Sequence, residues 1–188
     1  MHPRAWNDAA VSDPEHVDRT LKATAPALLG YFLRRTESSE DAADLVNDTL
    51  LSAWRSAGRM PGGEEAARMW LFGVARNVLR HHERGQRRRQ AIVSELSKVV
   101  VASPRLMMDD EAIDVRHAVA TLPAELAELV RLVHWDGFSI EQAAKLMRIP
   151  ASTARSRHAR AKSLLRSVLD TNRGRAHPRG ALVENANP

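Results

Sequence analysis

The stretch SIEQAAKLMRIPASTARSRHARAKSLL, from Ser139 to Leu165, holds two short helical patterns separated by a proline. Ser139 and Gln142 have the spacing of a capping box, and Pro150 is unsuited to a helix interior. The second helix is therefore expected to begin after this proline, with Ser152 as its cap. Two short helices joined by a tight turn predict a helix-turn-helix, whose second helix enters the major groove of DNA.

Charge distinguishes this stretch from a plain helical hairpin. Between Glu141 and Asp170 no residue is acidic, whereas the basic residues are Lys145, Arg148, Arg155, Arg157, Arg160, Lys162 and Arg166. Charges of one sign repel each other, and this repulsion is offset when phosphates are neutralised and counterions are released. Small residues between the cations let the helix backbone approach base edges, where arginine can contact guanine. The pattern favours DNA binding.

The composition is that of a helical protein. The chain has 188 residues, 4% aromatic residues, a formal net charge of +5 and no cysteine. The low aromatic content argues against a large β-sandwich, and the missing cysteine excludes disulfides and thiolate metal sites. No stretch approaches the roughly 18 consecutive apolar residues of a membrane span, and a signal-peptide pattern is not visible. We expect an all-α, cytoplasmic protein.

The first half of the chain predicts three helices. Apolar residues recur at helical spacing from Glu15, with Pro26 as a kink or a restart, and then after Ser38, which has the position of a helix cap. A glycine-rich loop from Ser56 to Glu64 precedes the third helix, which is expected to end in the basic run from Arg84 to Arg89. Because bulky side chains bury a large area, four residues are expected in or near the core: Trp54, Trp70, Leu71 and Phe72.

The second half predicts four more helices, at residues 114–120, 124–135, 139–147 and 152–169. The whole pattern is interpreted as two small helical domains, at residues 15–89 and 111–170, joined by a linker at residues 90–110. Residues 1–14 and 171–188 lack periodicity and are expected to be disordered.

Three segments carry a resemblance to a known family. They are DAADLVNDTLLSAWR from Asp41, WLFGVARNVLRHHERGQRRR from Trp70, and TLPAELAELVRLVHWDGFSIEQAAKLMRIPASTARSRHARAKSLL from Thr121. The first two resemble region 2, and the third resembles region 4, of the extracytoplasmic-function (ECF) sigma factors of the sigma-70 family. Arg148 stands where that family usually has a glycine. The resemblance implies two helical domains that bind core RNA polymerase and promoter DNA.

The resemblance also implies roles for individual residues. Those expected to contact core polymerase are Asp41, Asp44, Asn47 and Asp48. Those expected at the -10 element are Arg59, Arg76, Asn77, Arg80, Arg84, Arg87 and Arg88. Those expected at the -35 element are Lys145, Ser152, Thr153, Arg155, Ser156, Arg157, Ala159 and Arg160. In the last group, Arg160 is expected to face bases and Arg155 a phosphate, and the loop at Ser56 to Glu64 is expected to hold a flipped base.

Each of these features also has a purely structural interpretation. The acidic residues fit a solvated helix face, the run at Arg84 to Arg89 fits a solubilising helix end, and the loop fits a simple connector. The sequence His81-His82-Glu83 lacks the spacing of metal ligands on one helix face, so we expect no metal and no cofactor.

Three functions remain open at this point. A sigma factor would have core RNA polymerase, promoter DNA and an anti-sigma factor as partners, and it would not be an enzyme. A stand-alone helix-turn-helix regulator would instead use its first domain to dimerise or to sense a ligand. A helical hydrolase or metal enzyme would need a nucleophile with its base or clustered ligands, and the sequence shows neither.

Overall fold

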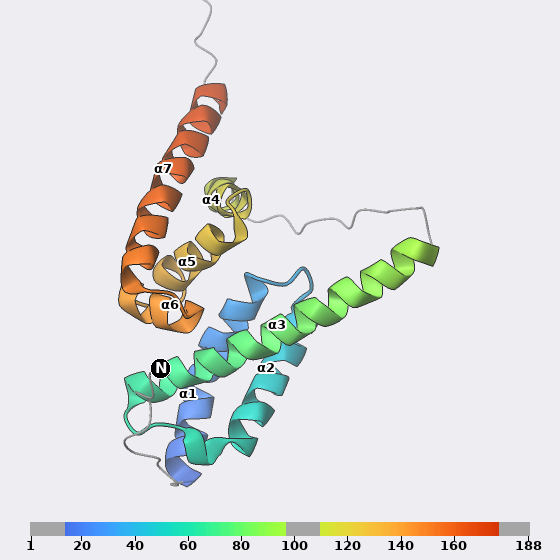
Figure 1. Cartoon of the computed structure of the whole chain (residues 1–188), viewed down its shortest axis with the longest axis vertical. Coiled ribbons are helices and arrows are strands. Elements are labelled where there is room, and N and C mark those ends of the chain that lie inside the picture. Colours follow the sequence, from blue (N-terminus) through green and yellow to red (C-terminus); the bar gives the residue numbers. More distant parts are fainter. Residues whose placement is uncertain (1–13, 97–109, 177–188) are drawn as a thin grey trace, which may run out of the picture.

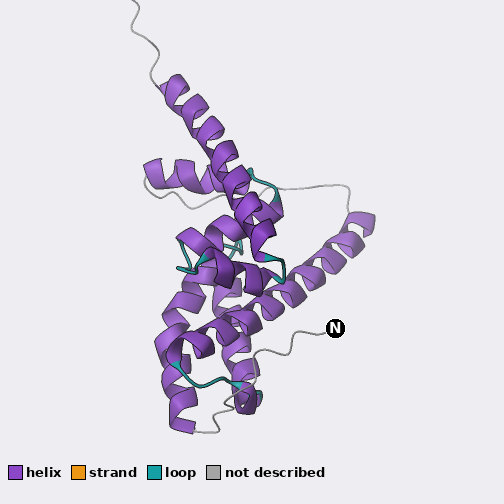
Figure 2. Ribbon diagram, turned by 60° about the vertical axis from the view of Figure 1, so that its left-hand side comes forward, coloured by secondary structure: helices purple, strands orange, loops and turns teal. Residues whose placement is uncertain are grey.

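The computed structural model describes residues 14–96 and 110–176, and all the regular structure in these ranges is helical (Figure 2). The prediction of an all-α fold is therefore confirmed. The helices are α1 (Pro14–Leu33), α2 (Ser39–Arg55), the short 3-10 helix η1 (Ala57–Arg59), α3 (Glu64–Leu96), α4 (Asp110–Ala120), α5 (Ala124–His134), α6 (Ile140–Met147) and α7 (Ala151–Ala176).

Helices α1, α2 and α3 form the first bundle. Its core holds Leu28 and Phe32 from α1, Leu45 from α2, and Leu71 and Phe72 from α3, all of which are buried. The loop after α2 is attached to this core by Met60, whose side chain is fully buried. The expected burial of Leu71 and Phe72 is confirmed.

Pro26 lies inside α1, so of the two alternatives at this position the restart is wrong. Helix α3 continues to Leu96, so the prediction that it ends at Arg89 is also wrong. The residues from Gln90 to Leu96 include neither glycine nor proline, the two residues that most strongly disfavour a helix interior, so the helix continues. Figures 1 and 2 show this end of α3 projecting beyond the other helices.

Helices α4 to α7 form the second bundle, which confirms the four helices predicted in this half of the chain. Val119, Leu122, Leu126, Val130 and Ala161 make a buried cluster between α4, α5 and α7. Helix α7 extends to Ala176, so the prediction of a disordered end from residue 171 is wrong for residues 171–176. Again, no proline interrupts the chain before this point.

The two bundles pack against each other. Helix α6 lies against α3, and one buried cluster continues from Leu28 and Phe72 of the first bundle to Leu132, Phe138 and Leu146 of the second (Figure 1). Residues far apart in the chain therefore share one core.

Three remaining expectations concern the linker, the ends and membrane insertion. The expected linker includes residues 97–109, and the expected disordered ends include residues 1–13 and 177–188; these segments lie outside the described residues. Among the helices that the structure describes, none combines the length and apolar character needed to cross a bilayer.

Candidate nucleic-acid and protein interfaces

The turn between α6 and α7 has the capping box and the break before α7 that the sequence predicts. Ser139 accepts a hydrogen bond from the backbone N–H of Gln142, and the Gln142 side chain accepts one from the backbone N–H of Ser139, which completes the capping box. Arg148 ends α6 in the left-handed conformation, with φ of 58°. Glycine is the usual residue in this conformation because it has no Cβ. Helix α7 then begins at Ala151, so Ser152 lies inside the helix and is not its cap.

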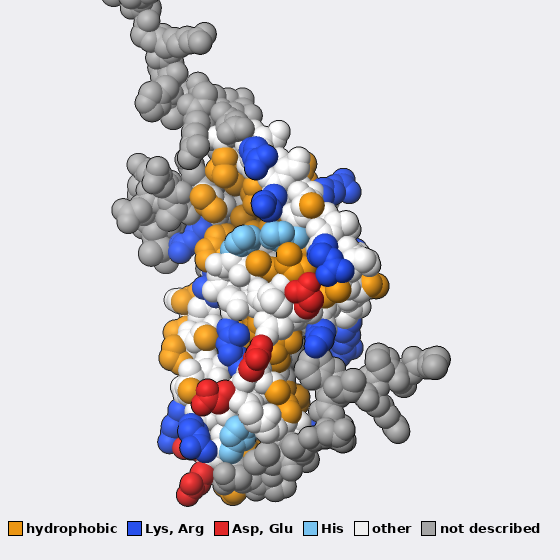
Figure 3. Space-filling model, turned by 90° about the vertical axis from the view of Figure 1, so that its left-hand side faces the viewer, with side chains coloured by type: hydrophobic (Ala, Val, Ile, Leu, Met, Phe, Trp, Pro, Cys, Tyr) orange, Lys and Arg blue, Asp and Glu red, His pale blue; other side chains and the backbone are white. Residues whose placement is uncertain are grey.

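One side of α7 faces solvent. Ala154 and Ala161 are buried against the second bundle, which fixes the rotation of the helix. Of the residues expected at the -35 element, the exposed ones on the opposite side are Ser152, Arg155, Ser156, Ala159 and Arg160. Figure 3 shows the side of the molecule where α7 lies; in its upper part Lys and Arg side chains lie among hydrophobic and His side chains, and the Asp and Glu side chains in view lie lower. This face is helical, basic and accessible.

Other residues of the expected -35 group lie differently. Arg157 is turned toward α5 and pairs with Glu125 at 2.6 Å, and Thr153 is half-buried. Lys145 is exposed on α6. Arg155 pairs with Glu141 at 3.0 Å, but both side chains are more than half exposed, so water screens this pair. Arg157 therefore faces α5 and not the outer side of α7, a position that the charge pattern did not indicate.

The acidic residues of α2 form an accessible stripe. Ser38 caps the helix by accepting hydrogen bonds from the backbone N–H groups of Glu40 and Asp41. Asp44, Asn47 and Asp48 are exposed, and Asp41 is partly exposed.

The stripe continues into exposed apolar residues at the end of α2. Leu51 is 48% exposed and Trp54 is 55% exposed. The prediction that Trp54 belongs to the core is wrong, because Ala53 occupies the buried face and the next residue is rotated by about 100° around the helix. Trp70, the other tryptophan expected near the core, is half-buried.

The residues expected at the -10 element follow one helix and its preceding loop. Asn77, Arg80, Arg84, Arg87 and Arg88 are exposed along α3, and Arg59 is exposed in the loop. Arg76 differs from these residues, because its Nη1 donates a hydrogen bond to the backbone carbonyl of Leu146 at 2.9 Å. Arg76 and Asn77 also line a pocket of about 320 Å³ between α3 and α6.

The histidines of the described residues make one notable pair. Nε2 of His134 on α5 and Nε2 of His158 on α7 are 3.0 Å apart, with nearly parallel rings. Partial burial lowers the pKa of His158, and His134 and Lys162 lower it further. The described part of the chain contains no group of three or more His, Cys, Asp or Glu residues that could hold a metal ion.

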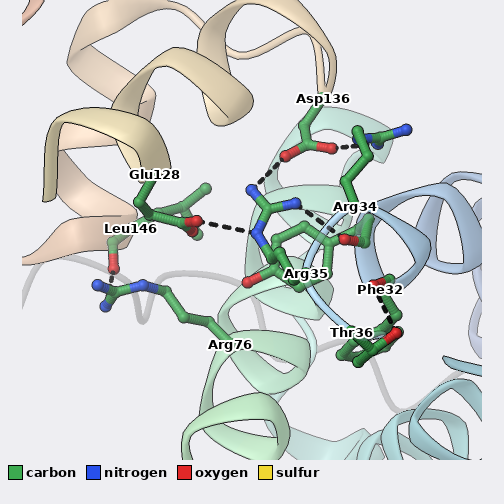
Figure 4. Close-up of polar contacts among 9 residues, drawn as sticks. Phe32, Arg34, Arg35, Thr36, Arg76, Glu128, Asp136 and Leu146 are labelled. Carbon is green, nitrogen blue, oxygen red and sulfur yellow. Dashed lines mark hydrogen bonds and ion pairs between the residues drawn. The ribbon is translucent and has the colours of Figure 1, made fainter. Parts of the chain in front are cut away.

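A buried ionic cluster at the contact between the bundles was not expected from the sequence. The side chain of Asp136 is 0% exposed and pairs with Arg34 at 2.5 Å and with Arg35 at 2.8 Å (Figure 4). Nε of Arg35 also donates to Glu128 at 2.9 Å. Burial by itself would lower the pKa of Arg35, but Glu128, Tyr31 and Asp136 together raise it. In the sequence, Asp136-Gly137 is a turn signal, and a turn signal does not indicate distant partners.

Comparison with known families agrees with this geometry. Residues 21–89 match sigma-70 region 2, and residues 112–165 match sigma-70 region 4. The chain is 31% identical over 151 residues to the ECF RNA polymerase sigma factor EcfG of Rhodopseudomonas palustris, covering 79% of this chain and 82% of that protein. It is 32% identical to the ECF sigma factor SigL of Mycobacterium tuberculosis, covering 77% and 84% of the two chains.

Solved structures show the same architecture. The sigma factor RpoE, solved in complex with the anti-sigma factor NepR from Bartonella quintana, has a TM-score of 0.65 and 28% identity, over 83% of this chain and 98% of that one. CnrH, solved in complex with the cytosolic domain of CnrY, has a TM-score of 0.60 and shares the fold at 19% identity, over 86% and 92%. The chain belongs to the ECF family of RNA polymerase sigma factors.

Proposed function

We propose that the chain is a dissociable promoter-specificity subunit that binds core RNA polymerase through α2, the -35 element through α7 and the -10 element through α3. The observation that carries this proposal is the solvent-facing basic side of α7, which follows a helix-turn-helix turn and lies in a stretch with no acidic residue between Glu141 and Asp170. The family membership supports the assignment of the two DNA elements to the two bundles.

The composition of the α2 surface supports a protein partner. Asp44 and Asp48 offer negative charge to a basic partner, and Leu51 and Trp54 offer an apolar area on the same helix. An exposed tryptophan beside leucine is typical of the centre of an interface, because large apolar side chains supply much of the binding energy. We assign this surface, with Asp41 and Asn47, to the contact with core polymerase.

At the -10 element, the chain is proposed to act through the free energy of binding to DNA and not through a catalysed reaction. The exposed arginines of α3 can neutralise phosphates, and Asn77 carries both a donor and an acceptor for a base edge. Contacts of this kind to unpaired bases offset the few kcal/mol needed to unstack them. The loop with Arg59 is proposed to hold the flipped base. Core polymerase supplies the chemistry of RNA synthesis, so we assign no catalytic group to this chain.

We also infer two features of the cellular setting. The solved relatives RpoE and CnrH are bound to NepR, an anti-sigma factor, and to CnrY, and we propose an anti-sigma factor as an inhibitory partner of this chain. A partner of core RNA polymerase acts where transcription occurs, which places the proposed function in the bacterial cytoplasm.

Charge reversal on α2 tests the proposal. Mixing the chain with core polymerase, followed by size-exclusion chromatography, should show co-elution that Asp44→Arg with Asp48→Arg abolishes. The matched control reverses two acidic residues of α1, Glu15→Arg with Asp18→Arg, and should co-elute normally. Binding of duplex DNA by both variants checks that the second bundle is intact. Co-elution of the α2 variant at wild-type affinity would show that the stripe is only a solvated face.

A further inference from the structure

Two histidines of the second bundle meet at the surface between α5 and α7. Nε2 of His134, the last residue of α5, lies 3.0 Å from Nε2 of His158 on α7, and the planes of the two rings differ by 18°. The side chain of His134 is exposed, and that of His158 is half-buried. The two nitrogens therefore face each other at a place that water and dissolved ions can reach.

The packing of α5 on α7 holds these rings in place. Val130 of α5 and Ala161 of α7 belong to one buried cluster, and each lies about one helical turn from one of the two histidines. Arg157 of α7 and Glu125 of α5 add an ion pair between the same helices at 2.6 Å. The separation of the rings is therefore set by the packed helices, and a ligand that suits this separation needs little rearrangement to bind.

The rings have the chemistry and the separation of two ligands of one metal ion. Neutral imidazole is a common ligand of zinc, nickel and copper ions. Metal–nitrogen distances of about 2.0 to 2.1 Å place two nitrogens on a tetrahedral ion about 3.4 Å apart. The two Nε2 atoms, at 3.0 Å, need to separate by only a few tenths of an ångström to reach this geometry.

Binding of an ion replaces the hydrogen bond between the rings. In that bond one Nε2 donates its hydrogen to the other Nε2. When the ion takes this place, the hydrogen moves to Nδ1 of its own ring, so both rings stay neutral and both Nε2 lone pairs bind the ion. No oxidation or reduction accompanies the exchange.

The surroundings of the pair indicate an open site. The described residues hold no group of three or more His, Cys, Asp or Glu side chains arranged for a metal, so water completes the coordination. Lys162 is close enough to act on the charge of His158, but its side chain is exposed, so water and salt screen the repulsion of a cation. Two rings still bind more tightly than one, because the second ring binds the ion within the same molecule.

We propose that His134 and His158 form a two-histidine site for a divalent transition-metal ion of the zinc and nickel class, and that the bound ion joins α5 to α7. This proposal replaces the expectation of no metal, which rested on the sequence His81-His82-Glu83. Ligand spacing within one helix does not reveal two ligands that lie 24 residues apart on two helices. The site is independent of the proposed function, although α7 is the helix assigned to the -35 element.

Equilibrium dialysis of the full chain, without an affinity tag, against ZnCl2 tests the site. The wild-type chain should bind one zinc ion at least about tenfold more tightly than His134→Gln or His158→Gln, each of which keeps one ring of the pair. The matched control, His81→Gln with His82→Gln, removes two neighbouring histidines of α3 and should bind like the wild type. Equal affinity of the wild type and the two single variants would overturn the proposal.

A second measurement uses the wild-type chain and does not depend on the folding of a variant. Zinc chloride should shift the Nε2 signals of two histidines together in a ¹⁵N NMR titration of the imidazole rings, with one binding curve for both. Magnesium chloride should shift neither, because magnesium prefers oxygen ligands. Zinc shifts confined to separate histidines with different binding curves would overturn the proposal.

The link between the helices has its own measurement. An ion that binds only the folded chain stabilises it by mass action, so 100 µM ZnCl2 at a dissociation constant of about 10 µM should raise the thermal midpoint by about 3 °C. His158→Gln should lose this rise. An equal rise in the wild type and in His158→Gln would show that the ion does not join α5 to α7. None of these measurements involves DNA or polymerase, so their outcome is separate from that of the proposed function.

Discussion

Arg35 and Asp136 form an ion pair at 2.8 Å across 101 residues of sequence, with the Asp136 side chain fully buried and that of Arg35 nearly so. The pair joins the segment just after α1 to the turn between α5 and α6, which precedes the helix-turn-helix. Removing one partner from such a pair leaves the other charge buried without compensation.

We therefore expect Asp136→Ala to lower the free energy of unfolding by about 3 kcal/mol, since loss of one partner of a buried pair has effects of this size. The control is Asp18→Ala on α1, whose partner Lys22 is 76% exposed, and it should change stability by less than about 0.5 kcal/mol. Urea unfolding followed by circular dichroism measures both. Similar values for the two variants would show that the buried pair does not stabilise the folded chain.

Arg148 gives a prediction of the opposite sign. It is the non-glycine residue with positive φ among the described residues, and this conformation costs an L-residue about 1 to 2 kcal/mol. Arg148→Gly should therefore raise the free energy of unfolding by about 1 kcal/mol. Arg148→Ala, which keeps the Cβ, should not raise it. Equal stability of the glycine and alanine variants would show that the conformation is not strained.

The pair formed by His134 and His158 predicts a dependence of stability on pH. Because burial, His134 and Lys162 lower the pKa of His158, the folded state binds a proton less readily than the unfolded state does. The stabilisation is present above about pH 6.5, the ordinary pKa of histidine, and is lost as the pH falls through the lowered pKa. The hydrogen bond between the two rings also requires at least one neutral ring.

Thermal unfolding at pH 7.5 and pH 5.5 measures this dependence. The midpoint of the wild-type chain should fall more between these pH values than that of His158→Gln, which cannot gain a proton at this position. Parallel midpoints in the two proteins would contradict the prediction.

Arg155 and Arg160, both on the outer side of α7, should differ in their effect on DNA binding. Arg160→Ala should relax the preference for one base pair, with a loss of about 1 to 3 kcal/mol on the preferred sequence. Arg155→Ala should weaken binding to all sequences alike and reduce the slope of log affinity against log salt by about 0.9. Binding of the full chain to a panel of single-base variants of the -35 element, at several salt concentrations, distinguishes the two. An equal loss of base preference from both changes would refute the assignment.

Local rules explain why the helix-turn-helix could be predicted. Ser139, Gln142 and Pro150 act on their immediate neighbours, so the cap and the break follow from sequence spacing. The end of α3 could not be predicted in the same way, because the polar run from Arg84 to Arg89 interrupts the apolar period without ending the helix. The burial of Trp54 was predicted wrongly because the prediction rested on residue type and not on its position beside Ala53, which occupies the buried face.

The contact between the bundles could not be predicted from local sequence patterns. Asp136 has its partners about a hundred residues earlier in the chain, at Arg34 and Arg35, and no periodicity connects these positions. Local sequence patterns give none of these three positions a partner. Only the packing of α5 and α6 on the first bundle brings these three charges together.

We propose that this chain directs core RNA polymerase to promoters. The most direct test reconstitutes the chain with core polymerase lacking other sigma factors, transcribes a library of bacterial genomic fragments and sequences the RNA 5′ ends. We predict a set of new start sites that share two upstream elements at constant spacing, and we predict their loss with Asp44→Arg and Asp48→Arg. Start sites identical to those of core polymerase alone, from a chain that still binds duplex DNA, would contradict it and would favour a stand-alone helix-turn-helix regulator.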